Sequence, residues 1–324
     1  MQRWVMSPYE ALVRSLPLAL AEARRSPMID GPRVDHPWRR MASFIALAVL
    51  LTLTVSVVVA IVLVFVPDLA DLLRTDGPLP DTNMRLFDEA LYVLASGPLL
   101  GSLALAILAA AAITYRLRPS DFLWPGRSFN ARDLGVGLLA MSCLGVILIP
   151  WYQLTGSEWS PPLLDPLYAD WTRPVFLVAS VVGLLIAAFA EEVVCRGVLL
   201  RLTAQATRHP LVLCLINGVI FSALHLDPDP VGFVARALSG AVWTWAVLRL
   251  GGLEFATGAH LANNLIISLF WSPLSEAEVG RDSQWIELAP EVLTAVVILA
   301  ITERLARGPR EWGLRPLAPG GPAP

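Results

Sequence analysis

The stretch "LIAAFAEEVVCRGVLL", from Leu185 to Leu200, is apolar enough to lie in a membrane and yet carries Glu191, Glu192 and Arg196. An ionised side chain at the centre of a bilayer costs about 2.5–3.5 kcal/mol on insertion scales, so such residues face a protein interior or a water-filled cavity. Glu192 and Arg196 are four residues apart, so they share one helix face and can neutralise each other. Glu191 is rotated by about 100° from Glu192 and is free to point at something else.

The whole chain has the composition of a membrane protein. Of its 324 residues, 56% are hydrophobic and 16% are charged, whereas soluble domains contain about 45–50% and about 25%. The apolar excess lies in blocks of roughly 17–25 residues, the length that spans a bilayer. The sequence therefore predicts an all-α, polytopic transmembrane bundle of about eight helices. The predicted spans are 41–66, 87–115, 134–152, 174–203, 210–226, 231–249, 253–272 and 288–304.

We expect five regions along the chain. Residues 1–40 form a cytoplasmic N-terminal arm with an amphipathic helix, and 41–173 hold the first three spans and a loop. Residues 174–272 form a core of four spans. An outer loop and the last span occupy 273–304, and 305–324, rich in Pro and Gly, form a disordered cytoplasmic tail. Clusters of Pro, Asp, Gly and Ser indicate loops at 67–86, 153–173 and 273–287.

The arginines set the expected orientation, because cytoplasmic loops of membrane proteins carry an excess of positive charge. The loops that we place inside contain Arg39, Arg40, Arg116, Arg118, Arg127, Arg132, Arg201, Arg208, Arg249, Arg304, Arg307 and Arg310. The loops that we place outside hold Arg74, Arg85, Arg173 and Arg281. An even number of spans then puts both termini in the cytoplasm. The fifth and sixth spans are short and separated only by "LDPDP", so a re-entrant pair would also fit.

Two further predicted spans carry polar groups at helical spacing. Phe221 and His225 are four residues apart in "FSALH", and His260 and Asn264 are four apart in "HLANN". A carboxylate, two imidazoles and a carboxamide thus occur within the last five spans, while the first three carry almost nothing polar. Small residues near the start of the seventh span would let it approach its neighbours closely. If these helices pack together, Glu191 and the two histidines can share one site.

These groups suit the hydrolysis of a peptide bond without a covalent intermediate. A carboxylate and a neutral imidazole around one water can deprotonate it, and a second imidazole and a carboxamide can donate hydrogen bonds to an oxyanion. Neither a GxSxG nor an HExxH pattern is present. A zinc ion held by Glu191, His225 and His260 is a minority alternative, and a purely structural role for the whole set is another; we expect no cofactor.

One count argues against a shared site. At 1.5 Å per residue, Glu191 lies about 18 Å from the inner end of its span, His260 about 12 Å and His225 about 22 Å. Tilt, or a fifth span that begins deeper in the membrane, is needed to bring the three side chains to one level.

The three motifs together resemble those of the CPBP intramembrane peptidases, a family that includes type II CAAX prenyl proteases, abortive-infection proteins and bacteriocin self-immunity proteins. "EEVVCRG" fits EExxxR, "FSALH" fits FxxxH and "HLANN" fits HxxxN, in the family's order and within about 174–272. The resemblance implies a glutamate-type intramembrane protease. It further implies that Glu191 and His225 activate a water molecule and that His260 and Asn264 stabilise the oxyanion. Glu192 and Arg196 would then orient the acidic pair, and Phe221 would wall the cavity.

The substrate expected on this interpretation is a membrane-associated protein or peptide, cleaved in a bacterial cytoplasmic membrane. The absence of lysine among the 24 basic residues suggests a GC-rich genome, and the scattered arginines give no support to nucleic-acid binding. Two other functions fit the same buried groups: a proton-coupled transporter, or a non-catalytic membrane adaptor or immunity protein of the same fold.

Overall fold

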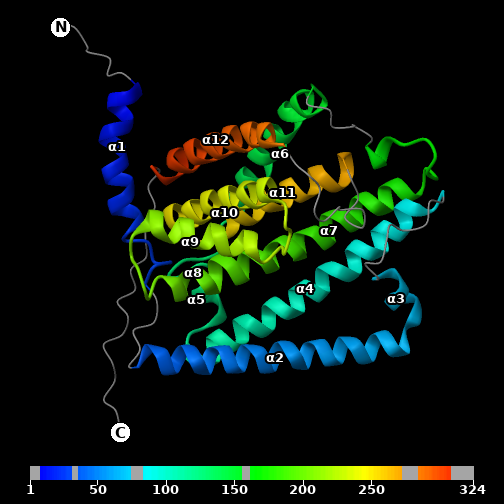
Figure 1. Cartoon of the computed structure of the whole chain (residues 1–324), viewed down its shortest axis with the longest axis horizontal. Helices are drawn as coiled ribbons and strands as arrows, with labels where there is room; N and C mark the ends of the chain where they lie inside the picture. The colour runs from blue at the N-terminus through cyan, green and yellow to red at the C-terminus, as the bar shows by residue number, and fades with distance from the viewer. Residues whose placement is uncertain (1–7, 31–35, 74–82, 155–160, 272–283, 308–324) are drawn as a thin grey trace.

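A computed structural model describes residues 8–30, 36–73, 83–154, 161–271 and 284–307, and every regular element within these ranges is a helix (Figure 1). The predicted all-α class is confirmed. Leu305 and Ala306, predicted to begin the disordered tail, instead end the last helix, and the rest of that tail from residue 308 lies outside the described residues, as does much of the predicted outer loop.

All eight predicted spans are helical. Within the described ranges, six helical segments are long and apolar enough to cross a membrane. They are α2 (Pro37–Phe65), α4 (Arg85–Tyr115), α6 (Ala131–Leu154), the continuous segment Thr172–Thr203, α10 (Pro230–Leu250) and Trp285–Ala306, which contains α12 (Leu288–Ala306). Together with the family evidence below, they make the chain an integral membrane protein.

The other two predicted spans are shorter helices. α9 (Pro210–Ala223) has 14 residues and α11 (Glu254–Phe270) has 17, which correspond to about 21 and 26 Å. α11 is enclosed by protein over more than half its length, because every residue from Glu254 to Ala262 is buried. His260 lies in this enclosed part, whereas Asn263 and Asn264, which follow it, are partly buried.

The segment Thr172–Thr203 is not one uniform α-helix. α7 (Thr172–Glu192) continues into a π-helix, η2 (Val193–Leu199), and then into α8 (Leu200–Thr203). The backbone N–H of Leu200 bonds to the carbonyl of Cys195, five residues earlier, which is the spacing of a π-helix. Short π segments inside α-helices often mark functional sites, and this one begins directly after the two glutamates.

The expected loop 67–86 contains a short helix, α3 (Pro67–Leu72). Pro67 occupies the first turn and is followed by Asp68, and both residue types favour a helix N-terminus. Another short helix, α5 (Pro119–Leu123), precedes α6. The N-terminal arm contains the expected helix, α1 (Pro8–Ala23).

α7 lies between α4 and α11, while α6 packs on α11, α9 on α10, and α2 on the outside of α4 (Figure 1). Glycines permit the closest approaches. A Cβ on Gly97 of α4 would overlap the carbonyl of Gly183 on α7, and a Cβ on Gly258 of α11 would overlap the carbonyl of Leu134 on α6. These contacts bring α4 close to α7 and α6 close to α11, and α11 also packs on α7.

Alternate helix ends meet at one end of the bundle, where α1 crosses the other helices (Figure 1). Arg40 at the start of α2 donates to the carbonyl of Thr114 at the end of α4 (3.1 Å). Arg249 at the end of α10 pairs with Glu303 of α12 (2.8 Å) and with Glu22 of α1 (2.7 Å). This arrangement matches the alternation of predicted inside and outside loops. Which membrane side this end faces stays a prediction.

Candidate active site

The ion pair between Glu192 and Arg196 forms as the spacing predicts. Arg196 Nη1 lies 2.8 Å from Glu192 Oε1, and both side chains are fully buried. Arg196 Nη2 also donates to the carbonyl of Gly240 on α10 (3.1 Å), and the guanidinium lies 4.3 Å above the ring of Phe221 on α9. An arginine over an aromatic face is attracted by the ring quadrupole. The pair is thus compensated and tied to two neighbouring helices.

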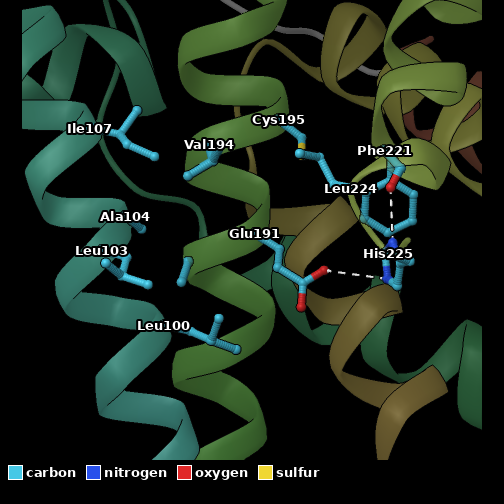
Figure 2. Close-up of a pocket in the computed structure, with 11 residues that line it drawn as sticks. Leu100, Leu103, Ala104, Ile107, Glu191, Val194, Cys195, Phe221, Leu224 and His225 are labelled. Carbon is cyan, nitrogen blue, oxygen red and sulfur yellow. Dashed lines mark hydrogen bonds and ion pairs between the residues drawn. The ribbon is translucent and has the colours of Figure 1, made fainter. Parts of the chain in front are cut away.

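Glu191 points away from this pair and towards both histidines. Its Oε2 lies 4.0 Å from Nε2 of His225 and 3.7 Å from Nε2 of His260. Figure 2 shows the carboxylate of Glu191 facing the ring of His225. The Glu191 side chain is 28% exposed, whereas that of Glu192 is fully buried. One glutamate is therefore enclosed and the other is accessible, as the sequence predicts.

His225 follows the end of α9, in a turn. Its Nδ1 lies 2.9 Å from the backbone carbonyl of Phe221. Because a carbonyl oxygen only accepts hydrogen bonds, this contact assigns the proton to Nδ1. In the neutral ring, Nε2 is then a bare acceptor that faces Glu191.

His260 connects the two glutamates. Its Nδ1 lies 3.0 Å from Glu192 Oε1, and its Nε2 faces Glu191. The Glu192 carboxylate already accepts a bond from Arg196, so it also accepts here and places a proton on Nδ1 of His260. Neutral His260 therefore also presents a bare Nε2, and only its imidazolium form can donate from that atom.

Asn264, the fourth predicted catalytic residue, contacts its neighbour Asn263 by a hydrogen bond. It lies one turn beyond His260 on α11, is partly buried, and accepts a hydrogen bond from Asn263 (3.4 Å). Among the described residues, no hydrogen bond joins Asn264 to Glu191 or to either imidazole.

Glu191 and His225 form the polar part of a pocket of about 260 Å³. The wall opposite Glu191 is apolar and comes from one stripe of α4 (Figure 2). That stripe consists of Leu100, Leu103, Ala104 and Ile107. Cys195, Phe221 and Leu224 complete the lining near His225. Phe221 thus forms part of the pocket wall, in the predicted position. The accessible carboxylate of Glu191 faces an otherwise largely apolar pocket.

Within the described ranges, no group of three or more His, Cys, Asp or Glu residues is arranged to hold a metal ion. The zinc alternative at Glu191, His225 and His260 thus gains no support from the coordinates. Catalysis without a cofactor stays a prediction.

Sequence reasoning missed the contribution of α10. Trp243 stacks on His260 and Gly240 receives Arg196, yet neither belongs to a recognised motif. A Cβ on Gly240 would lie 3.0 Å from Gly218 Cα and 3.1 Å from Phe221 Cβ, so this glycine lets α9 and α10 approach closely. The available signal was weak: two tryptophans in "AVWTWAVLRL", otherwise an ordinary apolar helix.

Comparison with known proteins shows which family the sequence around this site resembles. Residues 173–266 match the family model described as type II CAAX prenyl endopeptidase Rce1-like. The uncharacterized protein YyaK of Bacillus subtilis (strain 168) is 30% identical over 153 residues, which cover 45% of this chain and 50% of YyaK. No solved structure matches significantly. The matched segment holds all three motifs, and the chain spans about half the length of YyaK. The resemblance that the motifs indicate is therefore confirmed for residues 173–266.

Proposed function

We propose that this protein is an intramembrane endopeptidase that hydrolyses a peptide bond of a membrane-associated protein or peptide. One observation carries the proposal: the Nε2 atoms of His225 and His260 approach the same oxygen of Glu191, at 4.0 and 3.7 Å, beside an apolar pocket. The Rce1-like family match supports a CAAX-type protease at family level. The residue roles below are proposals.

Glu191 and His225 are the proposed base. A water between Glu191 Oε2 and His225 Nε2 would meet two acceptors, and it loses a proton to one of them as its oxygen attacks the carbonyl carbon. The same proton then passes to the nitrogen of the leaving amine when the C–N bond breaks. The hydrogen bond from Nδ1 of His225 to the Phe221 carbonyl would keep Nε2 directed at this water.

His260 and Asn264 are the proposed oxyanion donors. With Nδ1 of His260 bonded to Glu192, His260 can donate from Nε2 only when both ring nitrogens carry protons. Asn264 would supply its amide once a substrate occupies the space beside α11. Stabilisation of the developing oxyanion is often the largest single catalytic contribution.

The test uses the purified full-length protein in detergent micelles. The probe is a synthetic peptide with a C-terminal CAAX sequence, supplied with and without a farnesyl group on its cysteine, and products are identified by mass spectrometry. We expect cleavage by the wild-type protein and a loss of about 10³-fold or more in Glu191→Gln, because the proposed base is removed. Cleavage that survives added EDTA would support metal independence.

Glu291→Gln is the matched control, because Glu291 is another partly buried carboxylate and accepts a hydrogen bond from Tyr152 (3.3 Å) on helices that do not line the pocket. It should cleave at the wild-type rate. Equal thermal stability of wild type and Glu191→Gln would exclude misfolding. Normal cleavage by Glu191→Gln would show that Glu191 is not the base.

A further inference from the structure

The orientation of the His260 ring depends on contacts at its edge and on contacts at its face. Nδ1 faces Glu192 at 3.0 Å and Nε2 faces Glu191 at 3.7 Å. Both contacts lie at the edge of the ring, and the contact at Nε2 is longer than a hydrogen bond, so neither supports the flat face when the side chain rotates about its Cα–Cβ and Cβ–Cγ bonds. A contact against the face of the imidazole restricts that rotation.

Trp243 of α10 supplies this contact. The centroids of its ring and the His260 ring are 4.7 Å apart, with the planes inclined by 29°, which is a stacked arrangement. Phe221 approaches His260 at 5.7 Å and 83°, so it presents an edge contact and not a second stack. Trp243 itself is 4% exposed and packs against Phe221 at 5.7 Å.

The place of Trp243 is fixed from several sides. Phe221 and Arg196 both contact its ring: the ring centroid of Phe221 is 5.7 Å away, and the guanidinium of Arg196 lies 5.5 Å from the Trp243 ring centroid. Gly240, one turn earlier on α10, accepts the hydrogen bond from Arg196. Arg196 also pairs with Glu192, the carboxylate that bonds to Nδ1 of His260. One guanidinium therefore contacts both the stacked Trp243 and that carboxylate.

We propose that Trp243 is a positioning residue that holds the imidazole of His260 in the orientation in which its two nitrogens reach Glu191 and Glu192. Trp243 is absent from the lining of the pocket, so its effect on substrate is indirect. Its effect on turnover rests on the proposed function, whereas its effect on the ring of His260 does not.

Trp245 provides a matched control on the same helix. It is equally buried, at 7% exposure, but its Nε1 donates to Glu303 of α12 (2.9 Å), away from the pocket. Leucine at position 243 or 245 removes a tryptophan of similar burial, and only the change at 243 removes a stack on His260.

The first measurement is nuclear magnetic resonance of the full-length protein in detergent micelles, with histidine labelled by ¹³C and ¹⁵N. The chain has four histidines, and the His260→Gln variant assigns the signals of His260. In the wild type, the indole face should move the ring-proton signals upfield, and the ¹⁵N shifts should show a protonated Nδ1. Trp243→Leu should remove the upfield shift, and the ¹⁵N shifts of His260 should no longer show protonation at Nδ1 alone. Trp243→Phe should retain part of both, and Trp245→Leu should change neither.

The second measurement is cleavage of the CAAX-type peptide. Trp243→Leu should lower kcat by about 10- to 100-fold with KM within about twofold, because a misplaced catalytic group slows chemistry without removing the binding surface. Trp243→Phe should recover most of the rate, since a stacked aromatic ring remains. Thermal stability of each variant identifies any that fails to fold, and the milder Phe variant then serves.

Two outcomes overturn the proposal, and a third concerns the proposed function alone. His260 signals that are the same in Trp243→Leu and wild type would show that no stack positions the ring. Displaced signals with a kcat equal to that of Trp245→Leu would make Trp243 a packing residue. If the wild type cleaves neither peptide, the proposed function fails with these probes, and the His260 spectra alone decide whether Trp243 orients the ring.

Discussion

α2 and α11 are both apolar helices, yet they occupy opposite environments. No residue in the most apolar 18-residue stretch of α2 is buried by the protein, whereas α11 is buried from Glu254 through Ala262. α2 carries only Thr and Ser as polar residues within its apolar length, and Thr52, Thr54 and Ser56 bond to carbonyls of their own helix. α11 carries His260, Asn263 and Asn264.

The difference shows where a membrane protein can hold chemistry. A polar side chain that faces lipid must satisfy itself within its own helix, because lipid offers no partner. A polar side chain surrounded by other helices can find partners there, as His260 does with Glu192. Hydropathy alone identifies α2 most clearly. α11, which contributes His260 to the site, is shorter and is harder to recognise as a helix from hydropathy.

The largest expected effect comes from breaking the charge pair inside the buried region. Arg196→Leu leaves Glu192 fully buried without its arginine, which should destabilise the protein by about 3–5 kcal/mol. Unfolding by sodium dodecyl sulfate in mixed micelles measures the change. The double variant Glu192→Gln/Arg196→Met removes both charges and should be clearly more stable than the single variant. A single variant as stable as wild type would show that the pair is not enclosed as described.

A smaller effect should follow from crowding the contact between α6 and α11. A Cβ on Gly137 would overlap the carbonyl of Phe255 on α11, so Gly137→Ala should cost about 1–3 kcal/mol in the same unfolding assay. Gly135→Ala is the matched control on the same helix, since nothing lies within 4 Å of its added Cβ. Equal stabilities for the two variants would contradict the close approach of these helices.

The smallest effect is expected on α2. Leu53 is 59% exposed, so Leu53→Ala should change the free energy of unfolding by less than about 0.5 kcal/mol. The same change at Leu261 on α11, which is 5% exposed, should cost about 2 kcal/mol or more because it leaves a cavity. If both substitutions cost the same, α2 is covered by something other than lipid, such as a second copy of the chain.

The helices could be predicted from the sequence because long apolar runs determine them locally. The last span was predicted at 288–304 and α12 covers Leu288–Ala306, and the sixth was predicted at 231–249 and α10 covers Pro230–Leu250. α2 starts at Pro37, earlier than the predicted 41, because proline is favoured in the first turn of a helix. Residue spacing also predicted the Glu192–Arg196 pair, since four residues make one turn.

Other features depend on contacts that carry no local signal. Glu22 and Arg249 pair across 227 residues, and Trp243 meets His260 through the packing of separate helices. The count of about 18, 22 and 12 Å suggested a mismatch in depth because it assumed three straight helices that begin at one level. In the structure His225 lies in the turn after a short α9, and all three side chains meet.

The π-helix that follows Glu192 makes chain length part of the site. Its backbone bonds span five residues instead of four, so the wider turn takes up an additional residue while α7 and α8 keep nearly the relation that a regular helix would give them. Arg196 lies inside η2. Removal of one residue between Glu192 and Arg196 would shorten their spacing from four residues to three and change the pairing of the two buried charges.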